Sequence, residues 1–174
     1  MLFETKRLIL RRFTIEDVAA VYEFGSNAEV SKYTGEPPIS TMQEAEQIIN
    51  TVYLPEYEKY GYARMAVVHK KDQKVIGFAG LKYEAEWEAT DIGYRLLPEY
   101  WGKGLATEAA LPFIFYGLQV LKLPKIVGAA DEKNPASCKV LEKLGLKYKH
   151  TSDLIDDGNM YRWYELAKEE YVLA

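Results

Sequence analysis

The chain has 174 residues, of which 48% are hydrophobic and 28% charged, an ordinary composition for a globular protein. This length predicts a single domain over residues 1–174, with a core large enough to fold without disulfides or a structural metal. Acidic residues outnumber basic residues by 26 to 22, so the net charge is −4. This balance argues against broad binding of nucleic acid or of an anionic membrane, and no apolar run reaches the roughly 20 residues that a bilayer span requires.

The cysteine and histidine content limits the chemistry further. Cys138 is the single cysteine, so no disulfide can form within the chain. With only His69 and His150 besides, no group of side chains has the spacing of a zinc site. We therefore expect no metal and a reducing, cytoplasmic compartment.

The first third of the chain indicates a strand followed by two helices. Residues 7–13 alternate weakly in hydrophobicity, which predicts a strand. Thr14 can cap a helix with apolar residues on one side, and Ser40 or Thr41 opens a capping-box pattern for a second helix. Because proline lacks the N–H group that a helix interior needs, we expect Pro55 to end or kink this second helix.

The middle of the chain changes to strands. Residues 62–69 and 74–81 flank a short polar run and predict a hairpin, and residues 90–97 predict the next strand. A glycine turn over residues 102–104 then leads into a helical pattern, which is followed by an apolar strand over residues 125–130. This strand–helix–strand order predicts one parallel pair of strands joined by a right-handed crossover.

The last third predicts a short helix and a closing hairpin. Asn134 and Pro135 are the residue types expected for an N-cap and a first helical position, and Gly145 follows the end of the helical pattern. Two strands over residues 146–152 and 160–166 surround a turn-forming Asp-Asp-Gly-Asn sequence. Together, the elements indicate a mixed α/β (α+β) fold with antiparallel hairpins and one crossover.

The segment from Gly102 to Thr107 is the first sign of a ligand site. Two glycines at the start of a helix allow close approach of the backbone, and the free N–H groups of a first helical turn favour a phosphate. A Walker A loop is excluded, because Lys103 is followed by Gly104 and not by serine or threonine. A dinucleotide-binding loop is disfavoured, because Thr107 stands where the third glycine would be. Taken alone, a glycine turn between a strand and a helix is more often only a connection.

Further motifs resemble the GNAT superfamily of N-acetyltransferases, and the resemblance covers nearly the whole chain. Residues 5–11 and 74–78 are similar to strands of the branch that acetylates the N-terminal amines of ribosomal proteins. The other motifs are Asp91-Ile92-Gly93-Tyr94, the loop and helix start from Tyr100 to Ala109, Asn134-Pro135-Ala136-Ser137, and the run from Leu141 to Leu146.

The resemblance implies a central, twisted, mixed sheet, mostly antiparallel, of about seven strands flanked by about four helices. It also implies acetyl-CoA as co-substrate, with the pyrophosphate on the loop amides and the pantetheine arm along the strand that precedes the loop. The N–H group of Leu96 would hold the thioester carbonyl, and Asn134 would both cap its helix and contact the pantetheine. The residues implied in acetyl-CoA binding are Tyr94, Leu96, Leu97, Gly102, Lys103, Gly104, Leu105, Ala106, Thr107, Asn134 and Ser137.

Acetyl transfer to an amine requires a group that removes a proton, because an α-amine has a pKa near 8 and a lysine side chain a pKa near 10.4. Asp91 is the first candidate, since some members of the superfamily carry a catalytic carboxylate at this position. A structural, hydrogen-bonded aspartate is the alternative. Glu84, Glu86 and Glu88 are further candidates, and their spacing of two residues suggests one face of a strand, although a solvated edge has the same pattern.

The departing thiolate needs little help, because an ordinary thiol has a pKa near 8.5. The family often has a tyrosine acid in the helix that follows the asparagine, and in this chain that position is Leu141. Ser137 is therefore the candidate that donates a proton or a hydrogen bond to the sulfur, as the resemblance to the ribosomal-protein branch implies. The neighbouring Cys138 is interpreted as a buried, inert thiol.

Aromatic residues are more numerous than core packing requires, with 14 tyrosines and 3 tryptophans. Most of them are expected to be packing or surface residues. If a few line the acceptor site together with Glu36, Glu84 and Glu86, that site would suit a cationic amine. The aromatic residues in segments that border the acceptor side in this family are Tyr33, Tyr53, Tyr57, Tyr60, Tyr83, Trp87 and Tyr100.

The sequence therefore favours an N-acetyltransferase that acetylates a primary amine by direct transfer in a ternary complex, with a protein N-terminal amine as the acceptor that the branch implies. A small amine, such as a polyamine, an amino acid or an aminoglycoside, is an alternative acceptor, because the fold and donor site do not fix the acceptor. A non-catalytic acyl-CoA-binding module and a nucleotide binder are alternatives of other classes. The oligomeric state stays open, and a homodimer is one alternative.

Overall fold

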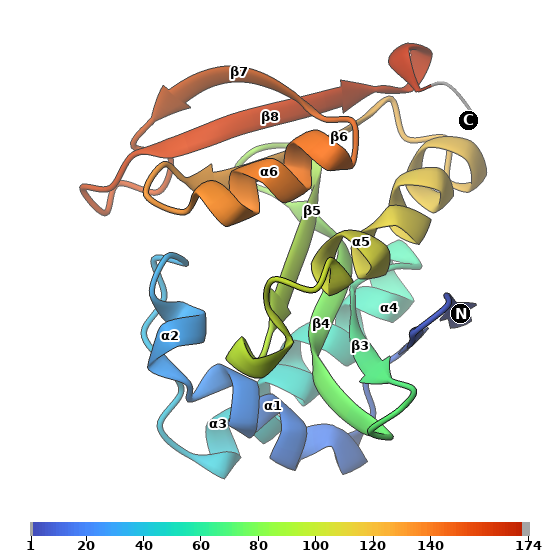
Figure 1. Cartoon of the computed structure of the whole chain (residues 1–174), viewed down its shortest axis with the longest axis vertical. Helices are drawn as coiled ribbons and strands as arrows, with labels where there is room; N and C mark the ends of the chain where they lie inside the picture. The colour runs from blue at the N-terminus through green and yellow to red at the C-terminus, as the bar shows by residue number, and fades with distance from the viewer. Residues whose placement is uncertain (1, 172–174) are drawn as a thin grey trace.

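The computed structural model describes residues 2–171, which form one eight-stranded sheet with helices on both faces (Figure 1). The strand order is β1-β2-β3-β4-β5-β6-β8-β7, and β5–β6 is the parallel pair in an otherwise antiparallel sheet. The strands are β1 Leu2–Glu4, β2 Leu8–Arg11, β3 Arg64–His69, β4 Lys74–Glu84, β5 Ala89–Leu96, β6 Lys125–Asp131, β7 Lys147–Ser152 and β8 Tyr161–Ala167.

The helices follow the sequence pattern closely at their starts. Asn27, Thr41 and Asn134 each accept a main-chain N–H of the first turn of the helix that follows them. The α-helices in the described residues are α1 Val18–Gly25, α2 Ala28–Ser31, α3 Met42–Ile48, α4 Leu54–Tyr60, α5 Leu105–Phe115 and α6 Pro135–Lys143. Ile49–Tyr53 and Tyr116–Val120 are π-helical, and Ile15–Asp17, Pro98–Tyr100 and Lys168–Glu170 are short 3₁₀ turns.

The mixed, mostly antiparallel sheet and its single parallel pair are confirmed. The strand count is higher than expected, because the three residues of β1 pair with β2 at the edge of the sheet and are too few to produce an alternating pattern. The helix count is also higher. The helix expected to end or kink at Pro55 continues through a π-helical turn into α4, where Pro55 stands in the first turn and needs no hydrogen-bond donor.

The helices pack on opposite faces of the sheet. The ring of Phe24 in α1 lies 5.9 Å from the ring of Phe78 in β4. Gly117, just after α5, is closely approached by the side chains of Leu81 in β4 and Ile126 in β6. Because positions 78 and 81 differ by an odd number, their side chains lie on opposite faces of β4, so α1 and α5 cover different faces.

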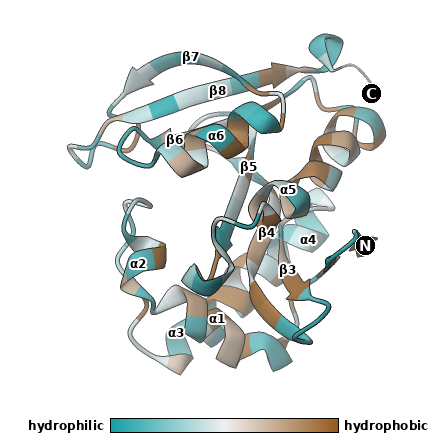
Figure 2. Cartoon of the chain, viewed as in Figure 1, coloured by the Kyte–Doolittle hydropathy of each residue, from teal (hydrophilic) through white to brown (hydrophobic). Residues whose placement is uncertain are grey.

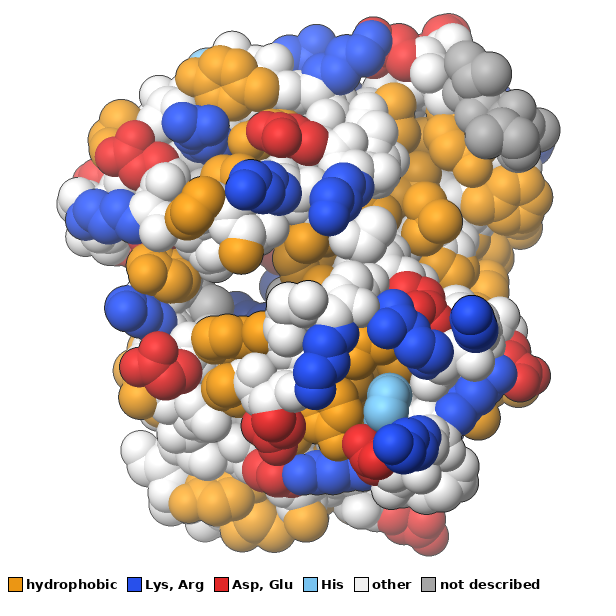
Figure 3. All heavy atoms as spheres, viewed as in Figure 1, with side chains coloured by type: hydrophobic (Ala, Val, Ile, Leu, Met, Phe, Trp, Pro, Cys, Tyr) orange, Lys and Arg blue, Asp and Glu red, His pale blue; other side chains and the backbone are white. Residues whose placement is uncertain are grey.

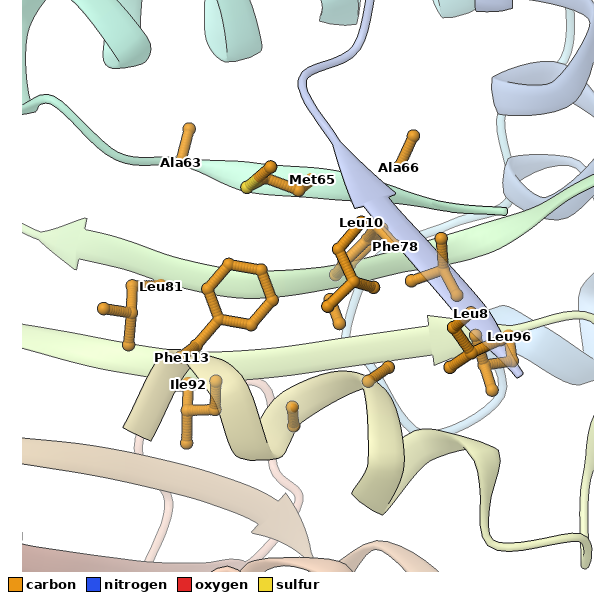
Figure 4. Packing of buried hydrophobic residues seen from close by; sticks show 14 of the residues in the cluster. Leu8, Leu10, Ala63, Met65, Ala66, Phe78, Leu81, Ile92, Leu96 and Phe113 are labelled. Atoms are coloured by element: carbon orange, nitrogen blue, oxygen red, sulfur yellow. The ribbon is translucent and has the colours of Figure 1, made fainter. Parts of the chain in front are cut away.

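The core lies between the central strands and these helices. Leu8, Leu10 and Phe113 are fully buried and come from the sheet and from α5 (Figure 4). The side chain of Leu141 in α6 packs closely over Gly128 of β6, on the same face as α5. Figure 2 shows hydrophobic residues concentrated in β3, β4 and α5. This core fixes the ends of β5 and β6 and the start of α5, which together form the candidate site.

Candidate active site

The sheet is open between β5 and β6. These two parallel strands pair at Asp91 and Val127 and then separate, whereas β5 pairs with β4 from Ala89 to Leu96 and β6 pairs with β8 along its length. Figure 3 shows a deep opening on this face of the molecule, bounded by α6, α2 and the segment that precedes α5 (compare Figure 1). The separation exposes main-chain groups in the middle of a sheet, where a ligand can pair with them.

The main-chain groups of β5 differ in their availability. The N–H of Leu97 donates to the carbonyl of Ile76 at 2.8 Å, and the carbonyl of Leu97 accepts from Tyr100 at 3.0 Å. Since successive N–H groups of a strand point to opposite sides, the N–H of Leu96 points away from β4, toward the opening. The carbonyl of Leu96 accepts the indole N–H of Trp101 at 2.6 Å. Leu96 therefore has the orientation expected from the sequence, whereas the main chain of Leu97 is occupied within the protein.

The loop before α5 presents unpaired N–H groups to solvent. Gly102 and Gly104 have φ angles of +70° and +73°, in the left-handed region that glycine adopts most readily. The first helical hydrogen bond runs from the N–H of Glu108 to the carbonyl of Gly104 at 3.1 Å. Within the described part of the chain, the N–H groups of residues 102–107 donate to no protein acceptor, and residues 102–104 are exposed. The geometry is that of an anion-binding helix start.

Tyr94 and Ser137 connect β5 to α6 beside the opening. The hydroxyl of Tyr94 donates to the carbonyl of Ser137 at 2.9 Å and lies 3.1 Å from the hydroxyl oxygen of the same residue. Asn134 accepts the N–H of Ser137 at 3.2 Å, which confirms its role as the N-cap of α6. Burial raises the pKa of Tyr94 above its ordinary value, although the hydrogen bond to Ser137 lowers it, so the phenol is neutral at physiological pH.

Asp91 is buried and forms an ion pair with Arg64 of β3. One guanidinium nitrogen of Arg64 donates to the carboxylate of Asp91, and another lies 3.2 Å from the main-chain carbonyl of Asp91. A side chain at Gly93 would overlap this guanidinium, so the glycine leaves the space that Arg64 occupies. Burial raises the pKa of Asp91 to about 6, although the charge of Arg64 lowers it.

Asp91 and Ser137 approach the opening from opposite faces of the sheet. Asp91 and Tyr94 are three positions apart on β5, so their side chains point to opposite faces. Ser137 is hydrogen-bonded to Tyr94 and therefore lies on the face of α6. Asp91 lies on the face of Phe78, which is packed against α1. The structure thus brings Ser137 together with Tyr94, and it separates Ser137 from Asp91.

Two of the other candidate acids are solvated. Glu86 and Glu88 lie in the turn between β4 and β5 and are exposed, so they do not share a strand face, and their exposure agrees with the alternative of a solvated edge. Four residues of this turn fall outside both strands, and a spacing of two has no common face there. Glu84 is on β4 and pairs with Lys82 at 3.0 Å.

Three of the aromatic residues considered for the acceptor site are packed against other side chains or the main chain. Tyr53 is buried and stacks on Phe13 at 4.6 Å, and Tyr57 is buried with its hydroxyl donating to the carbonyl of Arg64 at 2.6 Å. Trp87 packs edge-on against Trp163 at 5.1 Å. Their role in packing agrees with the simpler of the two interpretations made from the sequence.

Several site residues were not found from the sequence. Arg95 donates to Glu36 at 2.7 Å, and its guanidinium lies 5.4 Å from the ring centre of Phe78. Arg64, whose guanidinium also lies over the Phe78 ring, is a charged residue directly before four apolar residues of β3, and that contrast is the one sequence signal that marks it. Glu36 and Arg95 are 59 positions apart, so no local pattern joins them.

The segment between α2 and α3 contacts both β5 and the β7–β8 hairpin. A side chain at Gly35, next to Glu36, would overlap Ile155 and Asp157 of the β7–β8 connection and Tyr161 at the start of β8. Through the hydrogen bond from Arg95 to Glu36, the same segment is also joined to β5.

Residues 2–171 contain neither a metal-binding cluster nor a membrane-spanning helix. No cluster of three or more His, Cys, Asp or Glu side chains among them is arranged to hold a metal ion. None of the helices within that range combines the length and the apolar character needed to cross a bilayer.

The sequence of this chain matches the acetyltransferase (GNAT) domain family over residues 7–147, and the chain belongs to that family. It is 32% identical to the uncharacterized N-acetyltransferase YoaA of Bacillus subtilis, over 84% of this chain and 82% of that protein. It is also 32% identical to the uncharacterized N-acetyltransferase p20 of Bacillus licheniformis, over 96% of both chains. The spermidine N(1)-acetyltransferase of Escherichia coli is 29% identical over 78% of this chain and 70% of that protein.

Solved structures have the same fold. A GNAT-family acetyltransferase from Bacillus anthracis superposes with a TM-score of 0.83 at 27% identity, over 98% of this chain and all (100%) of that one. The spermidine N-acetyltransferase of Vibrio cholerae, solved with CoA and spermine, has a TM-score of 0.79 at 19% identity, over 96% and 99% of the chains. The ribosomal-protein-S5-alanine acetyltransferase of Vibrio fischeri has a TM-score of 0.78 at 22% identity, over 99% and 100%. This chain is therefore an N-acetyltransferase of the GNAT type.

Proposed function

We propose that this enzyme transfers the acetyl group of acetyl-CoA directly to a primary amine in a ternary complex, and that the acceptor is the N-terminal amine of a protein. The observation that carries the donor site is the separation of β5 and β6 next to the unpaired N–H groups of residues 102–107. A pantetheine arm can lie like a strand beside β5 where β5 and β6 separate, and a pyrophosphate can accept hydrogen bonds from the N–H groups of residues 102–107.

In the proposed donor complex, the N–H groups from Gly102 to Thr107 hold the pyrophosphate. The pantetheine arm lies along β5, where the main chain of Tyr94 and Leu96 faces the opening. Asn134 contributes from the start of α6 in addition to capping that helix. Leu97 contributes by packing, because its main-chain groups are already hydrogen-bonded.

The proposed reaction is an addition followed by an elimination. The neutral amine attacks the thioester carbonyl carbon, and the N–H of Leu96 stabilises the negative charge that develops on the carbonyl oxygen. The C–S bond then breaks, and its electron pair leaves with the sulfur. The proton lost by the amine passes through water to Asp91, and the thiolate receives a hydrogen bond or a proton from Ser137. The products are the acetylated amine and CoA.

The pairing of Asp91 with Arg64 suits the role of a base. Its pKa of about 6 lies above that of an ordinary aspartate, so the carboxylate is ionised at neutral pH and is a stronger proton acceptor than an exposed aspartate. Arg64 keeps the buried carboxylate oriented. Asp91 lies on the opposite face of the sheet from Ser137. This agrees with an amine acceptor and an acetyl donor that enter from different faces of the sheet.

The protein N-terminus is supported by the resemblance of residues 5–11 to the ribosomal-protein branch. A linear polyamine is the second candidate. The observation that favours it is the presence of Glu36, Glu84 and Asp91, which are paired with Arg95, Lys82 and Arg64; a polycation could compete with these basic side chains for the carboxylates.

The test is CoA release from acetyl-CoA, measured as free thiol, with a panel of amines. The panel contains peptides with free N-termini, the same peptides with blocked N-termini, and linear polyamines. The proposal expects release with free but not with blocked peptides; release with polyamines alone would replace the acceptor by the second candidate. CoA binding without release with any amine would instead favour a non-catalytic acyl-CoA-binding module.

Alanine variants of Trp87 and Tyr33 test the contribution of aromatic residues to acceptor choice. Neither side chain is a hydrogen-bonding partner of Asp91 or of Ser137. A changed ratio of rates between peptides and polyamines would support their place in the acceptor site, and an unchanged ratio would remove them from it.

A further inference from the structure

The turn between β1 and β2, residues 5–7, contacts the start of α5 through Arg7 and Glu108. The guanidinium of Arg7 donates from Nε to Glu108 Oε2 at 2.7 Å, and its Nη2 lies 2.7 Å from the same oxygen. The main-chain N–H of Arg7 donates to Glu108 Oε1 at 2.8 Å, and the hydroxyl of Thr5 donates to that oxygen at 2.7 Å. Glu108 is thus held by side-chain and main-chain donors from a segment about 100 positions away.

Arg7 also reaches the loop itself. Its Nη1 donates to the main-chain carbonyl of Lys103 at 2.9 Å. In a trans peptide unit the C=O and the following N–H point in opposite directions, and the backbone has no cis peptide bonds in its described part. Because Arg7 holds the Lys103 carbonyl on one side of the loop, the N–H of Gly104 is directed to the other side.

The charge of Arg7 has a second consequence. Glu108 lies in the first turn of α5, where a carboxylate is favoured by the helix dipole but opposes a bound anion. Arg7 compensates that negative charge at a contact of 2.7 Å. Without Arg7, the loop would have a free carbonyl and an uncompensated carboxylate close to its N–H groups.

We infer that Arg7 is a positioning residue for the CoA phosphates: by holding the Lys103 carbonyl and neutralising Glu108, it keeps the N–H groups of residues 102–107 in the orientation that binds the pyrophosphate. The inference rests on the proposed donor site. It assigns a role in donor binding to Arg7, a residue of the turn between β1 and β2.

The test compares acetyl-CoA with S-acetylpantetheine, which carries the same thioester but lacks the phosphates, using one amine acceptor for both donors. For Arg7→Ala, we expect kcat/KM with acetyl-CoA to fall about tenfold, the range for loss of a charge-assisted hydrogen bond, and kcat/KM with S-acetylpantetheine to stay the same. The Kd for CoA should rise by a similar factor. A residue with a merely structural role would lower activity with both donors.

Arg12→Ala is the matched control. The side chains of Arg7 and Arg12 are both 41% exposed and each pairs with a glutamate, but Arg12 contacts Glu58 at 3.4 Å, away from the loop. Arg12→Ala should leave the ratio between the two donors unchanged. Arg7→Lys keeps the positive charge but lacks the planar guanidinium, so its kcat/KM with acetyl-CoA should lie between those of Arg7→Ala and the wild type. If Arg7→Ala does not fold, the comparison is made with Arg7→Lys.

The inference is overturned if a folded Arg7→Ala or Arg7→Lys variant has the wild-type ratio between the donors and binds CoA with the wild-type Kd. It is also overturned if activity with both donors falls by the same factor. If the wild-type protein neither binds CoA nor uses S-acetylpantetheine, the proposed function itself fails, and that result is distinct from either of the others.

Discussion

The hydroxyl of Tyr94 donates to the main-chain carbonyl of Ser137 at 2.9 Å and lies 3.1 Å from the Ser137 hydroxyl oxygen, so a side chain of β5 fixes the first turn of α6. Since the phenol proton is used by the carbonyl, the Ser137 hydroxyl is free to donate, either to Tyr94 or to a sulfur atom in the opening. The contact therefore links the proposed thiol-binding group to the strand along which the pantetheine would lie.

Tyr94→Phe removes this contact and keeps the ring. We expect the free energy of unfolding to fall by about 1 kcal/mol, because one buried hydrogen bond is lost, and kcat to fall several-fold, because Ser137 is less well oriented. Denaturant unfolding and steady-state rates measure the two effects. In a double-mutant cycle with Ser137→Ala, the effects on kcat should not add; additive effects would show that Tyr94 does not act through Ser137.

The carboxyl of Asp91 predicts a pH dependence of activity. Its pKa of about 6 means that the base is ionised above pH 6 and protonated below it, so kcat should rise with pH through this value. Asp91→Asn should lower kcat and abolish this part of the profile. A variant that loses stability but keeps the same acid limb would identify Asp91 as structural.

The carboxyl of Asp91 also makes stability depend on pH, in the direction opposite to that of activity. Between the ordinary aspartate pKa of 3.8 and the raised pKa of about 6, the folded state binds more protons at Asp91 than the unfolded state does. This group alone therefore makes stability decrease as pH rises through that window. Compared with Asp91→Asn, the wild-type protein should show a relative loss of stability from pH 4 to pH 6 in urea unfolding.

Gly93 leaves the space that the Arg64 guanidinium occupies, so Gly93→Ala should disturb the Arg64–Asp91 pair. Breaking a buried ion pair typically costs about 3 kcal/mol or more. Gly61→Ala is the comparison, because Gly61 has a φ of +75° but nothing within 4 Å of an added Cβ, so only about 1 kcal/mol of backbone strain is expected. Equal losses of unfolding free energy for both variants would contradict the packing account of Gly93.

The pair Arg11–Asp17 predicts acid sensitivity. Arg11 donates to both carboxylate oxygens of Asp17 at 2.7 and 2.8 Å. Burial raises the pKa of Asp17, but the hydrogen bonds from Arg11 and Thr14 outweigh it, and the pKa is lowered overall. The stabilisation is therefore present above the ordinary aspartate pKa and is lost as pH falls through the lowered value.

Asp17→Asn should cost about 2 kcal/mol at pH 7, since the charge-assisted bonds are weakened. The difference between variant and wild type should shrink as the pH is lowered from 7 toward 2, because the carboxylate of Asp17 becomes protonated as the pH falls through its lowered pKa. Denaturant unfolding at the two pH values measures this. A difference that stays constant with pH would show that the hydrogen bonds, and not the charge, carry the stabilisation.

Short patterns in the sequence predict the starts of α5 and α6. Asn134 caps α6, and the glycine turn opens α5 with free N–H groups, because capping and left-handed backbone conformations depend on a few adjacent residues. The path of the helix through Pro55 was not predicted, because the spacing of the apolar residues does not indicate the π-helical turn that precedes it.

The contacts that orient the candidate site join distant residues. Arg64 and Asp91 are 27 positions apart, and Arg7 and Glu108 are 101 positions apart. Their pairing depends on the strand order β2-β3-β4-β5 and on the packing of α5, which no single segment encodes. A local pattern can also mislead. Glu84, Glu86 and Glu88 alternate in the sequence as they would on a strand, but Glu86 and Glu88 lie in a turn.

The central claim is that the opening beside residues 102–107 binds acetyl-CoA, and thermal denaturation in the presence of ligands tests it most directly. A ligand at about 100 times its Kd stabilises the folded state by about 2.7 kcal/mol, which clearly raises the unfolding midpoint. The account predicts a raised midpoint with acetyl-CoA and with CoA, and no comparable change with NAD or ATP. An unchanged midpoint with both CoA species, or equal shifts with NAD and ATP, would contradict it.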